Sequence, residues 1–321
     1  MIYCMSDIHG RIDLFEKMLE KINLQSGDML YVIGDSIDRG GGLKVIQKIK
    51  ELHDKGMATL LFGNHELMLI HNFYNHKDNK YIEDALDRIK EIQDKSERDV
   101  RRSNEIKKNP SLFGMIKLFS ILDRKVSELS EMNDKQVEIQ RSLASTAKCS
   151  SAEEWETFKD LAELPESEKN DILKFMMGLQ YSKEITVNGK NYLLVHGGIS
   201  DNEVMNLFVR DNFYMNEVSR KTLGQFGFKE DCTIIFGHTT TRDINIKLYN
   251  KYVAPHKIWF DKIHNDKIGI DCGASYPNGQ LACLRLDDMK EFYVVNEEKF
   301  ITPIDKINAC FEEIKMEVLN G

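Results

Sequence analysis

The sequence has no apolar run long enough to span a membrane, and no charged start that leads into an apolar signal core. It has no Cys-x-x-Cys pair either, and its six scattered cysteines indicate neither a disulfide framework nor a cysteine-bound zinc site. Lys and Arg number 44 against 52 Asp and Glu, so a net charge of −8 makes a nucleic-acid-binding surface unexpected. These absences predict a cytoplasmic protein with reduced thiols and without a nucleic-acid or membrane partner.

Five short apolar runs stand out in a chain that is otherwise an ordinary globular mixture, 41% hydrophobic and 30% charged. The runs are IYCM, MLYVI, TLLF, YLLV and TIIF, and each leads into a loop that combines glycine with Asp, Asn or His. Short continuous runs of this kind suit strands that are buried on both faces. Segments with helical spacing separate the first three runs, and this order predicts an α/β sheet with a ligand site at the carboxyl ends of its strands.

The polar residues at these strand ends offer oxygen and imidazole ligands without any thiolate, a set that suits Mn²⁺, Zn²⁺ or Fe. Each of them alone has an ordinary structural explanation, such as a helix cap, a turn or a satisfied core histidine. Their repetition at five strand ends favours one shared site instead. The candidates are Asp7, His9, Asp35, Asn64, His196 and His238.

The motifs DIHG, GDSIDRG, GNHE, HGG and GHT occur in this order, and together they resemble the calcineurin-like metallophosphoesterases. The Asp-Arg-Gly and Asn-His-Glu elements, with the late stretch IGIDCGASYPNGQLACLRLDD, are similar to the bacterial phosphoprotein phosphatase branch. The resemblance covers residues 1–75 and roughly 182–296. It implies a two-layer β-sandwich flanked by helices, an α/β/β/α fold, with a helical insertion.

The resemblance also implies a site for two divalent metal ions, which in such centres lie about 3.5–4 Å apart. Manganese is the expected ion, and iron or zinc are alternatives. Asp35 would bridge the two ions. The first ion would be held by Asp7, His9 and Asp35, and the second by Asp35, Asn64, His196 and His238.

The remaining motif residues have catalytic roles in the family. The resemblance implies that His65 protonates the leaving alkoxide while Asp38 orients its imidazole, a contribution of about 10²–10⁴ to the rate. Arg39 would hold phosphate oxygens with its planar fork of donors. A second phosphate-binding arginine is expected, with Arg210 as the better candidate and Arg220 or Arg242 as alternatives.

Two positions depart from the family pattern. Ser6 stands before Asp7 where many relatives have glycine, which changes the freedom of the backbone. Thr240 stands where other branches of the superfamily have a further histidine, so it is not counted as a ligand. This second departure favours the phosphatase branch over nucleases and cyclic-nucleotide hydrolases.

The middle of the chain differs in character from both ends. Residues 77–178 contain no strand-like run, and apolar residues recur there at helical spacing, as in Ile82, Leu86 and Ile89. We expect this segment to form a helical insertion or cap beside the active site. The predicted organisation is a discontinuous catalytic domain, residues 1–76 and 179–321, interrupted by the insertion 77–178.

These observations predict a metal-dependent phosphomonoesterase in which a two-metal-activated hydroxide attacks phosphate in line, and a protein serine/threonine phosphatase is the first expectation. A nucleotide hydrolase such as a symmetrical dinucleoside tetraphosphatase is the alternative, with Phe213, Tyr214 and Tyr276 as candidate base-stacking residues. A catalytically inactive binding module is disfavoured because the proposed acid and phosphate-binding residues are all present. The substrate would be a phosphorylated protein or a small phosphoester, and the oligomeric state stays open.

Overall fold

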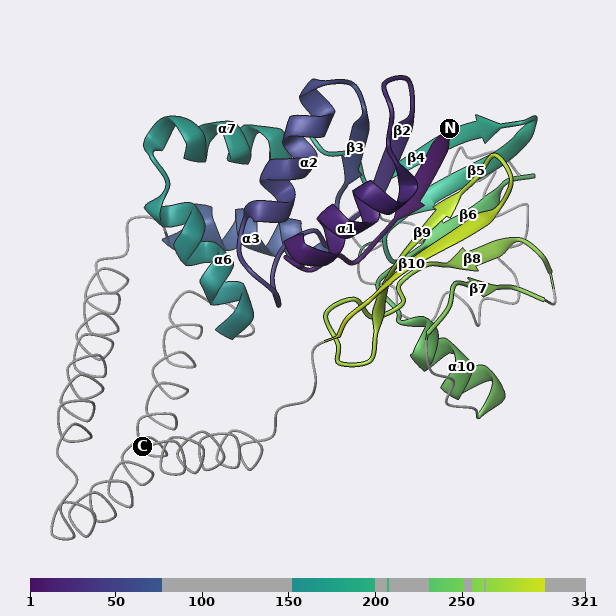
Figure 1. Ribbon diagram of the computed structural model, residues 1–321. Coiled ribbons are helices and arrows are strands. Elements are labelled where there is room, and N and C mark those ends of the chain that lie inside the picture. The colour runs from purple at the N-terminus through teal and green to yellow at the C-terminus, as the bar shows by residue number, and fades with distance from the viewer. Residues whose placement is uncertain (77–151, 200–206, 208–230, 251–255, 263, 298–321) are drawn as a thin grey trace, which may run out of the picture.

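Two five-stranded mixed sheets form the centre of the fold (Figure 1). The computed structural model describes residues 1–76, 152–199, 207, 231–250, 256–262 and 264–297. The first sheet has the order β10-β9-β1-β2-β3 and the second has the order β4-β5-β6-β8-β7. The strands are β1 (Ile2–Met5), β2 (Met29–Ile33), β3 (Ala58–Leu61), β4 (Ser182–Val187), β5 (Lys190–Val195), β6 (Thr233–Phe236), β7 (Trp259–Phe260), β8 (Lys267–Gly269), β9 (Gln280–Arg285) and β10 (Lys290–Val295).

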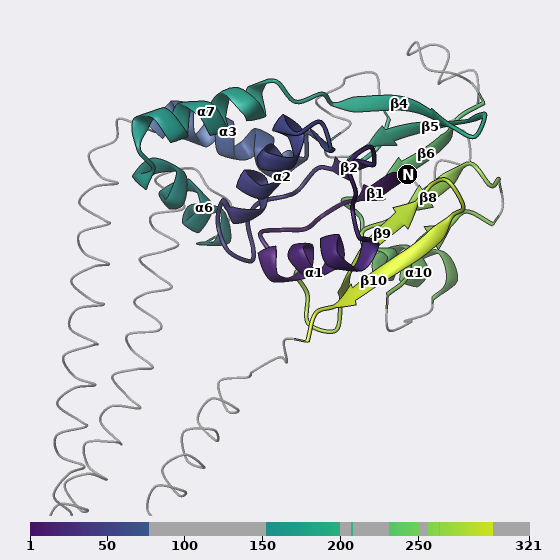
Figure 2. The same ribbon diagram turned by 45° about the horizontal axis from the view of Figure 1, so that its top comes forward.

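Helices cover the outer faces of both sheets, as Figures 1 and 2 show. Among the described residues, five helices share one apolar cluster with the first sheet, and a further helix contributes to a cluster on the second sheet. The helices are α1 (Ile12–Ile22), α2 (Lys44–Asp54), α3 (Asn64–His76), α6 (Ala152–Glu163), α7 (Glu166–Met177) and α10 (Thr241–Tyr249).

The alternation of side chains along the strands explains this layering. In β1, Tyr3 and Met5 point into the cluster under the helices, whereas Cys4 points into the cluster between the two sheets. In β5, Leu194 belongs to the same inter-sheet cluster, and Leu193 faces the α10 side. Because successive side chains of a strand point to opposite faces, strands of such a sandwich must be apolar throughout. The predicted α/β/β/α architecture is confirmed.

Parallel pairing brings the strand ends together. In the first sheet β1 pairs in parallel with β2, and β2 with β3. In the second sheet β5 pairs in parallel with β6. Parallel neighbours end on the same edge of a sheet, so the loops after β1, β2 and β3 lie together, and so do the loops after β5 and β6.

The hairpin between β4 and β5 turns at Asn188-Gly189, a dipeptide typical of two-residue hairpin turns. Val187 pairs with Lys190, and the two central residues have left-handed backbones, with φ of 49° at Asn188 and 78° at Gly189. Positive φ at both central positions is the requirement of a type I′ turn, which matches the twist of the flanking strands.

The described part of the proposed insertion packs on the core. Helices α6 and α7 contact α3, and the buried side chains of Phe158, Leu161 and Met176 belong to the cluster under the first sheet. Residues 77–151 lie outside the described residues, so the boundaries of the insertion stay a prediction.

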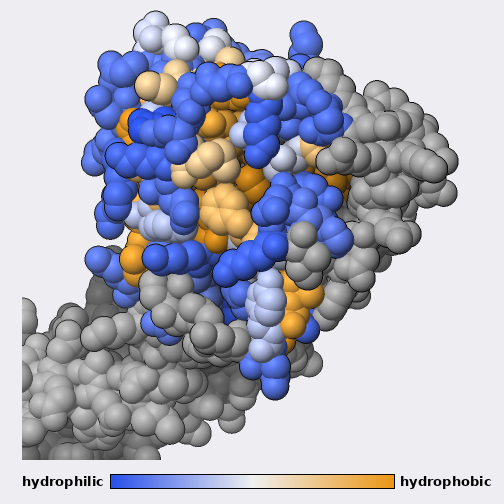
Figure 3. Space-filling view, turned by 90° about the vertical axis from the view of Figure 1, so that its right-hand side faces the viewer, coloured by the Kyte–Doolittle hydropathy of each residue, from blue (hydrophilic) through white to orange (hydrophobic). Residues whose placement is uncertain are grey.

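Hydrophilic residues cover much of the described surface in Figure 3, and the apolar residues on that face form smaller areas between them. Among the described residues, every helix is too short or too polar to cross a membrane.

We predict that Gly189→Ala lowers the free energy of unfolding by about 1–2 kcal/mol, the cost of a left-handed backbone for a residue with a Cβ. An added Cβ would meet no atom within 4 Å at this position, so the loss would come from the backbone alone. Chemical denaturation of the two proteins measures the difference.

The matched control is Gly178→Ala, because Gly178 has an ordinary φ of −87° and its added Cβ would make only ordinary contacts, the nearest at 3.4 Å. This control should be neutral or slightly stabilising. Equal destabilisation by both substitutions would contradict the assignment of the turn.

Candidate metal centre

The loops after five strands place their polar side chains around one point. Each strand end contributes one or two residues that the sequence singled out. Asp7 and His9 follow β1, Asp35 and Asp38 follow β2, Asn64 and His65 begin α3 after β3, His196 follows β5, and His238 follows β6.

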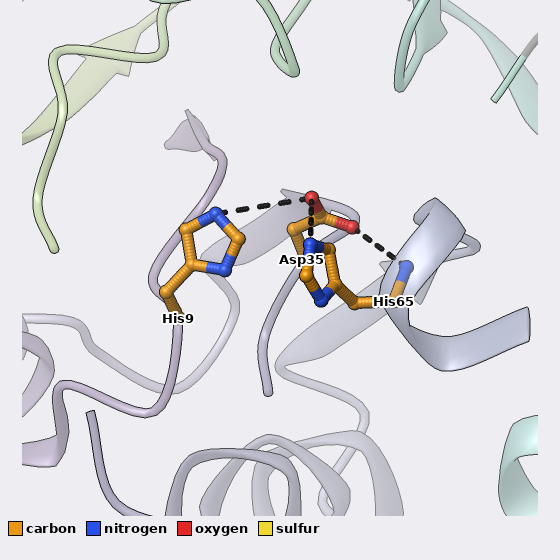
Figure 4. A group of neighbouring side chains, drawn as sticks. All are labelled: His9, Asp35 and His65. Atoms are coloured by element: carbon orange, nitrogen blue, oxygen red, sulfur yellow. Dashed lines mark hydrogen bonds and ion pairs between the residues drawn. The ribbon is translucent and has the colours of Figure 1, made fainter. Parts of the chain in front are cut away.

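The carboxylate of Asp35 lies at the middle of this group. Its Oδ2 is 3.2 Å from Nε2 of His196 and 3.8 Å from Nε2 of both His9 and His65. Figure 4 shows His9 and His65 on either side of Asp35, with ring nitrogens directed toward its oxygens. Asp35 therefore occupies the position that a bridging ligand needs.

Two groups of donor atoms could each hold a metal ion, and Asp35 belongs to both. One consists of His9, Asp35 and His65, and the other of Asp35, His196 and His238, with the ligand atoms of each within 4.8 Å of one another. The first group contains His65, which the sequence assigned to proton donation. The individual ligand roles stay predictions.

The two other predicted ligands border these groups. Oδ1 of Asp7 is 3.8 Å from Nε2 of His9, and Oδ1 of Asn64 is 3.0 Å from Nε2 of His196. All six predicted ligands are thus brought together.

Backbone carbonyls orient two of the histidines. Nδ1 of His9 lies 3.2 Å from the carbonyl oxygen of Ile37, and Nδ1 of His196 lies 2.9 Å from that of Ile33. A carbonyl can only accept a hydrogen bond, so Nδ1 carries the proton in both rings. In the neutral rings Nε2 then keeps its lone pair for a metal ion, the usual outer-shell arrangement of metal-binding histidines.

Carboxylates crowded in this buried site favour divalent cations as occupants. Burial, together with the negative charge of Asp35, raises the pKa of Asp7 to about 6. Burial also raises the pKa of Glu66, and burial beside Asp7 raises that of Asp271 well above its usual range. A divalent cation relieves this repulsion without protonation, and the oxygen and imidazole donors suit Mn²⁺, Zn²⁺ or Fe.

The backbone of the site is held in a conformation that side chains rarely adopt. Six predicted site residues have positive φ: Asp7, His9, Asp35, Asp38, Arg39 and His238, with values from 49° to 68°. Such residues cost on the order of 1 kcal/mol or more each and cluster at functional sites. The conformation is an independent sign that these loops serve a site.

Glu66 is a residue of the site that the sequence analysis quoted but gave no role. Its buried carboxylate accepts hydrogen bonds from the backbone amides of Asp35, Ser36 and Gly63, and from the hydroxyl of Ser36. It thereby ties the loop after β2 to the loop after β3. Its position in the sequence, directly after Asn64-His65 and at the start of an apolar helix, could have indicated that Glu66 belongs to the site.

Ser6, the departure from glycine, contacts a predicted ligand. Its Oγ lies within hydrogen-bond distance of Oδ2 of Asp7 and 2.7 Å from the carbonyl oxygen of Ile33. The backbone amide of His238 donates to the same Oδ2 of Asp7 at 2.9 Å. This hydroxyl therefore helps to fix the Asp7 carboxylate, an effect beyond backbone freedom.

His65 and Asp38 form the expected pair. Nδ1 of His65 lies 2.5 Å from Oδ2 of Asp38, and both side chains are buried. Burial alone would lower the pKa of His65, but the charge of Asp35 and the hydrogen bond to Asp38 raise it to about 9. The pairing leaves Nε2 directed at the centre, where a departing oxygen would need its proton.

The arginines are only partly described. Arg39 is exposed at the edge of the site, and its Nη1 donates a hydrogen bond of 3.1 Å to the hydroxyl of Tyr276. Arg242 lies in the first turn of α10. Arg210, Arg220, Phe213 and Tyr214 lie outside the described residues.

The fold and the donor set define a protein of the metal-dependent phosphoesterase class. Residues 1–259 match the family described as calcineurin-like phosphoesterase. The chain belongs to the calcineurin-like phosphoesterases.

Curated relatives are similar over a shorter stretch. The symmetrical bis(5'-nucleosyl)-tetraphosphatase of an Acidovorax species is 39% identical over 71 residues, which are 22% of this chain and 25% of that protein. The enzyme of the same name from Glaesserella parasuis is 33% identical over 97 residues, 30% of this chain and 35% of that protein. The chain therefore spans about a quarter to a third of these relatives' length.

Among solved structures, a metallophosphoesterase from Sphaerobacter thermophilus is similar with a TM-score of 0.40 at 13% identity. The similarity covers 93% of this chain and 89% of that one.

We predict that Asp35→Asn reduces the bound metal from about two ions to fewer than one per chain, because the change removes the charged oxygen shared by both donor groups. Elemental analysis of dialysed protein measures the metal content. Asp54→Asn is the control, since its side chain is 57% exposed on α2, away from the site. Full metal content in the Asp35 variant would show that this carboxylate does not bridge.

Proposed function

We propose that the chain is a metal-dependent phosphohydrolase that cleaves a phosphoric ester or anhydride by in-line displacement. One observation carries this proposal: two donor groups share the buried carboxylate of Asp35, and the His65–Asp38 pair lies directly beside it. Two donor groups that would hold divalent ions and share a carboxylate, with a proton donor beside them, suit phosphoryl transfer to water.

When bound, two divalent ions polarise phosphoryl oxygens and make water nucleophilic at neutral pH. The protein's own residues do the rest. Asp38 holds the proton on Nδ1 of His65 and stabilises the charged ring, while Nε2 of His65 donates a proton to the leaving oxygen. The guanidinium of Arg39 binds oxygens of the reacting phosphoryl group.

The first candidate substrate is a dinucleoside polyphosphate. The curated relatives named symmetrical bis(5'-nucleosyl)-tetraphosphatase support this candidate, although the similarity is partial. A phosphoserine or phosphothreonine protein is the second candidate, and its support is the sequence Asp38-Arg39-Gly40 with Asn64-His65-Glu66. Manganese as the ion and a reducing, cytoplasmic compartment also stay proposals, and the cysteines at 4, 232, 272 and 283 are free thiols.

Turnover of diadenosine tetraphosphate and of a phosphoserine peptide by the same manganese-loaded protein tests the substrate. We expect kcat/KM for the nucleotide to exceed that for the peptide at least about tenfold, and a chelator to abolish both activities. The reverse preference would replace the first candidate with the second. A metal-loaded protein that turns over no phosphoester at all would refute the enzymatic proposal.

We predict that His65→Asn lowers turnover by about 10²–10⁴ while the metal content stays unchanged, because the variant loses a proton donor. The loss should be larger for an alkyl phosphate than for p-nitrophenyl phosphate, whose leaving group needs no proton. Steady-state kinetics on both esters and elemental analysis measure these effects.

Asp38→Asn is the companion variant, and it should lose activity with the same leaving-group dependence. If His65→Asn instead releases metal, the residue is a ligand of the group formed with His9 and Asp35. Equal losses on both esters would also rule out proton donation.

A further inference from the structure

Tyr276 lies beside two guanidinium groups that come from different parts of the fold. Its ring centroid is 5.6 Å from Cζ of Arg39 and 5.5 Å from Cζ of Arg242. Arg39 follows β2 of the first sheet, and Arg242 lies in the first turn of α10 beside the second sheet. Both distances fall within the range in which a cation is attracted to an aromatic ring. Tyr276 therefore lies within cation–π range of two positive charges.

The loop that carries Tyr276 is held by hydrogen bonds at several points. The amide of Tyr276 donates to the carbonyl of Gly273, and its own carbonyl accepts from the amide of Gly279 and from Nδ2 of Asn296. Asn296 is buried, and its Nδ2 also donates to the carbonyl of Ala274. A Cβ at Gly279 would lie 1.8 Å from the carbonyl oxygen of Gly273, so the chain approaches itself as closely as glycine permits.

Arg242 is held in place from the other side. The amide of Thr241 donates to the carbonyl of Asp271, and the hydroxyl of Thr240 caps α10 by accepting from the amide of Asp243. Nε of Arg242 pairs with the carboxylate of Asp243 at 3.0 Å. Within the described part of the chain, the terminal amino groups of Arg242 have no hydrogen-bond partner.

The two positive charges beside Tyr276, on Arg39 and Arg242, favour binding of an anion. Arg39 faces the carboxylates of the metal centre, whose charge bound cations would offset. Among the described residues, Arg242 pairs with a carboxylate through Nε, and a second guanidinium lies over the same ring. Arg39 and Arg242 come from different parts of the fold and share the Tyr276 ring, so an anion with more than one phosphoryl group offers each of them a partner.

We propose that Arg39 and Arg242 bind consecutive phosphoryl groups of a polyphosphate chain, with Tyr276 setting the spacing between the two arginines. Arg39 takes the reacting group at the metal centre, and Arg242 takes the next group along the chain. Arg242 is thus a specificity-determining residue for substrates with more than one phosphate. The inference rests on the proposed function and assigns Tyr276 to positioning arginines rather than to stacking a base.

Inhibition of p-nitrophenyl phosphate hydrolysis by orthophosphate and by tripolyphosphate, at a fixed concentration of free Mn²⁺, tests the proposal. A hydrogen bond to a charged group is lost in Arg242→Gln, so tripolyphosphate should bind about tenfold more weakly or worse. The affinity for orthophosphate should change far less. Arg242→Lys should restore only part of the loss, because a single ammonium lacks the planar fork.

Lys247→Gln is the matched control, since it removes the same charge from an exposed position on the same helix. It should leave both inhibition constants within about twofold, because a change of net charge at an exposed site is largely screened. Tyr276→Leu removes the ring, and it should weaken tripolyphosphate binding as Arg242→Gln does.

Equal loss of orthophosphate and tripolyphosphate affinity in Arg242→Gln would overturn the proposal, and so would no loss of either. Selective loss with an acidic phosphopeptide, while tripolyphosphate binding stays unchanged, would overturn it in favour of a peptide-binding role. Calorimetric binding of tripolyphosphate to metal-loaded protein requires no turnover. A protein that binds tripolyphosphate through Arg242 without hydrolysing any ester would keep this inference while refuting the proposed function.

Discussion

The buried carboxylate of Glu66 is the contact on which the metal centre depends. It accepts hydrogen bonds from three backbone amides and one hydroxyl, which belong to the loop after β2 and the loop after β3. Most of the remaining site residues are carried by these two loops, so their geometry is set by a single acceptor group. An unsatisfied buried amide costs about 1–3 kcal/mol, and the loops have no regular secondary structure to satisfy these amides otherwise. This carboxylate therefore fixes the loops that carry Asp35, Asn64 and His65.

A second constraint joins the two sheets at the same point. His196 of the second sheet bonds the carbonyl of Ile33 in the first, and the amide of His238 donates to the carboxylate of Asp7. Left-handed backbones at several of these residues oppose the arrangement by on the order of 1 kcal/mol or more each. The inter-sheet core of apolar side chains offsets this strain. The free energy gained by packing the two sheets thus keeps the strained and charged site folded.

Much of this could be predicted from the sequence, because local patterns encode it. Apolar runs specify doubly buried strands, and the residues after them gather at one site wherever parallel strands end together. Glu66 escaped prediction because its role depends on which amides surround it in space. The return of β9 and β10 to the first sheet escaped for a similar reason, since strand order after residue 240 depends on long-range pairing. The pairing of Arg242 with Tyr276 likewise exists only after α10 and the β8–β9 loop have packed.

Arg39 and Arg242 each lie four residues after a predicted metal ligand, Asp35 and His238, whereas Tyr276 lies on the loop between β8 and β9. The similarity to tetraphosphatases extends over 71 to 97 residues, whereas about 200 positions separate Arg39 from Arg242. No single stretch of that length can contain both arginines, and the family match ends at residue 259, before Tyr276. The reaction class follows from the strand ends, whereas the proposed polyphosphate contact involves Tyr276, which lies outside the residues of the family match.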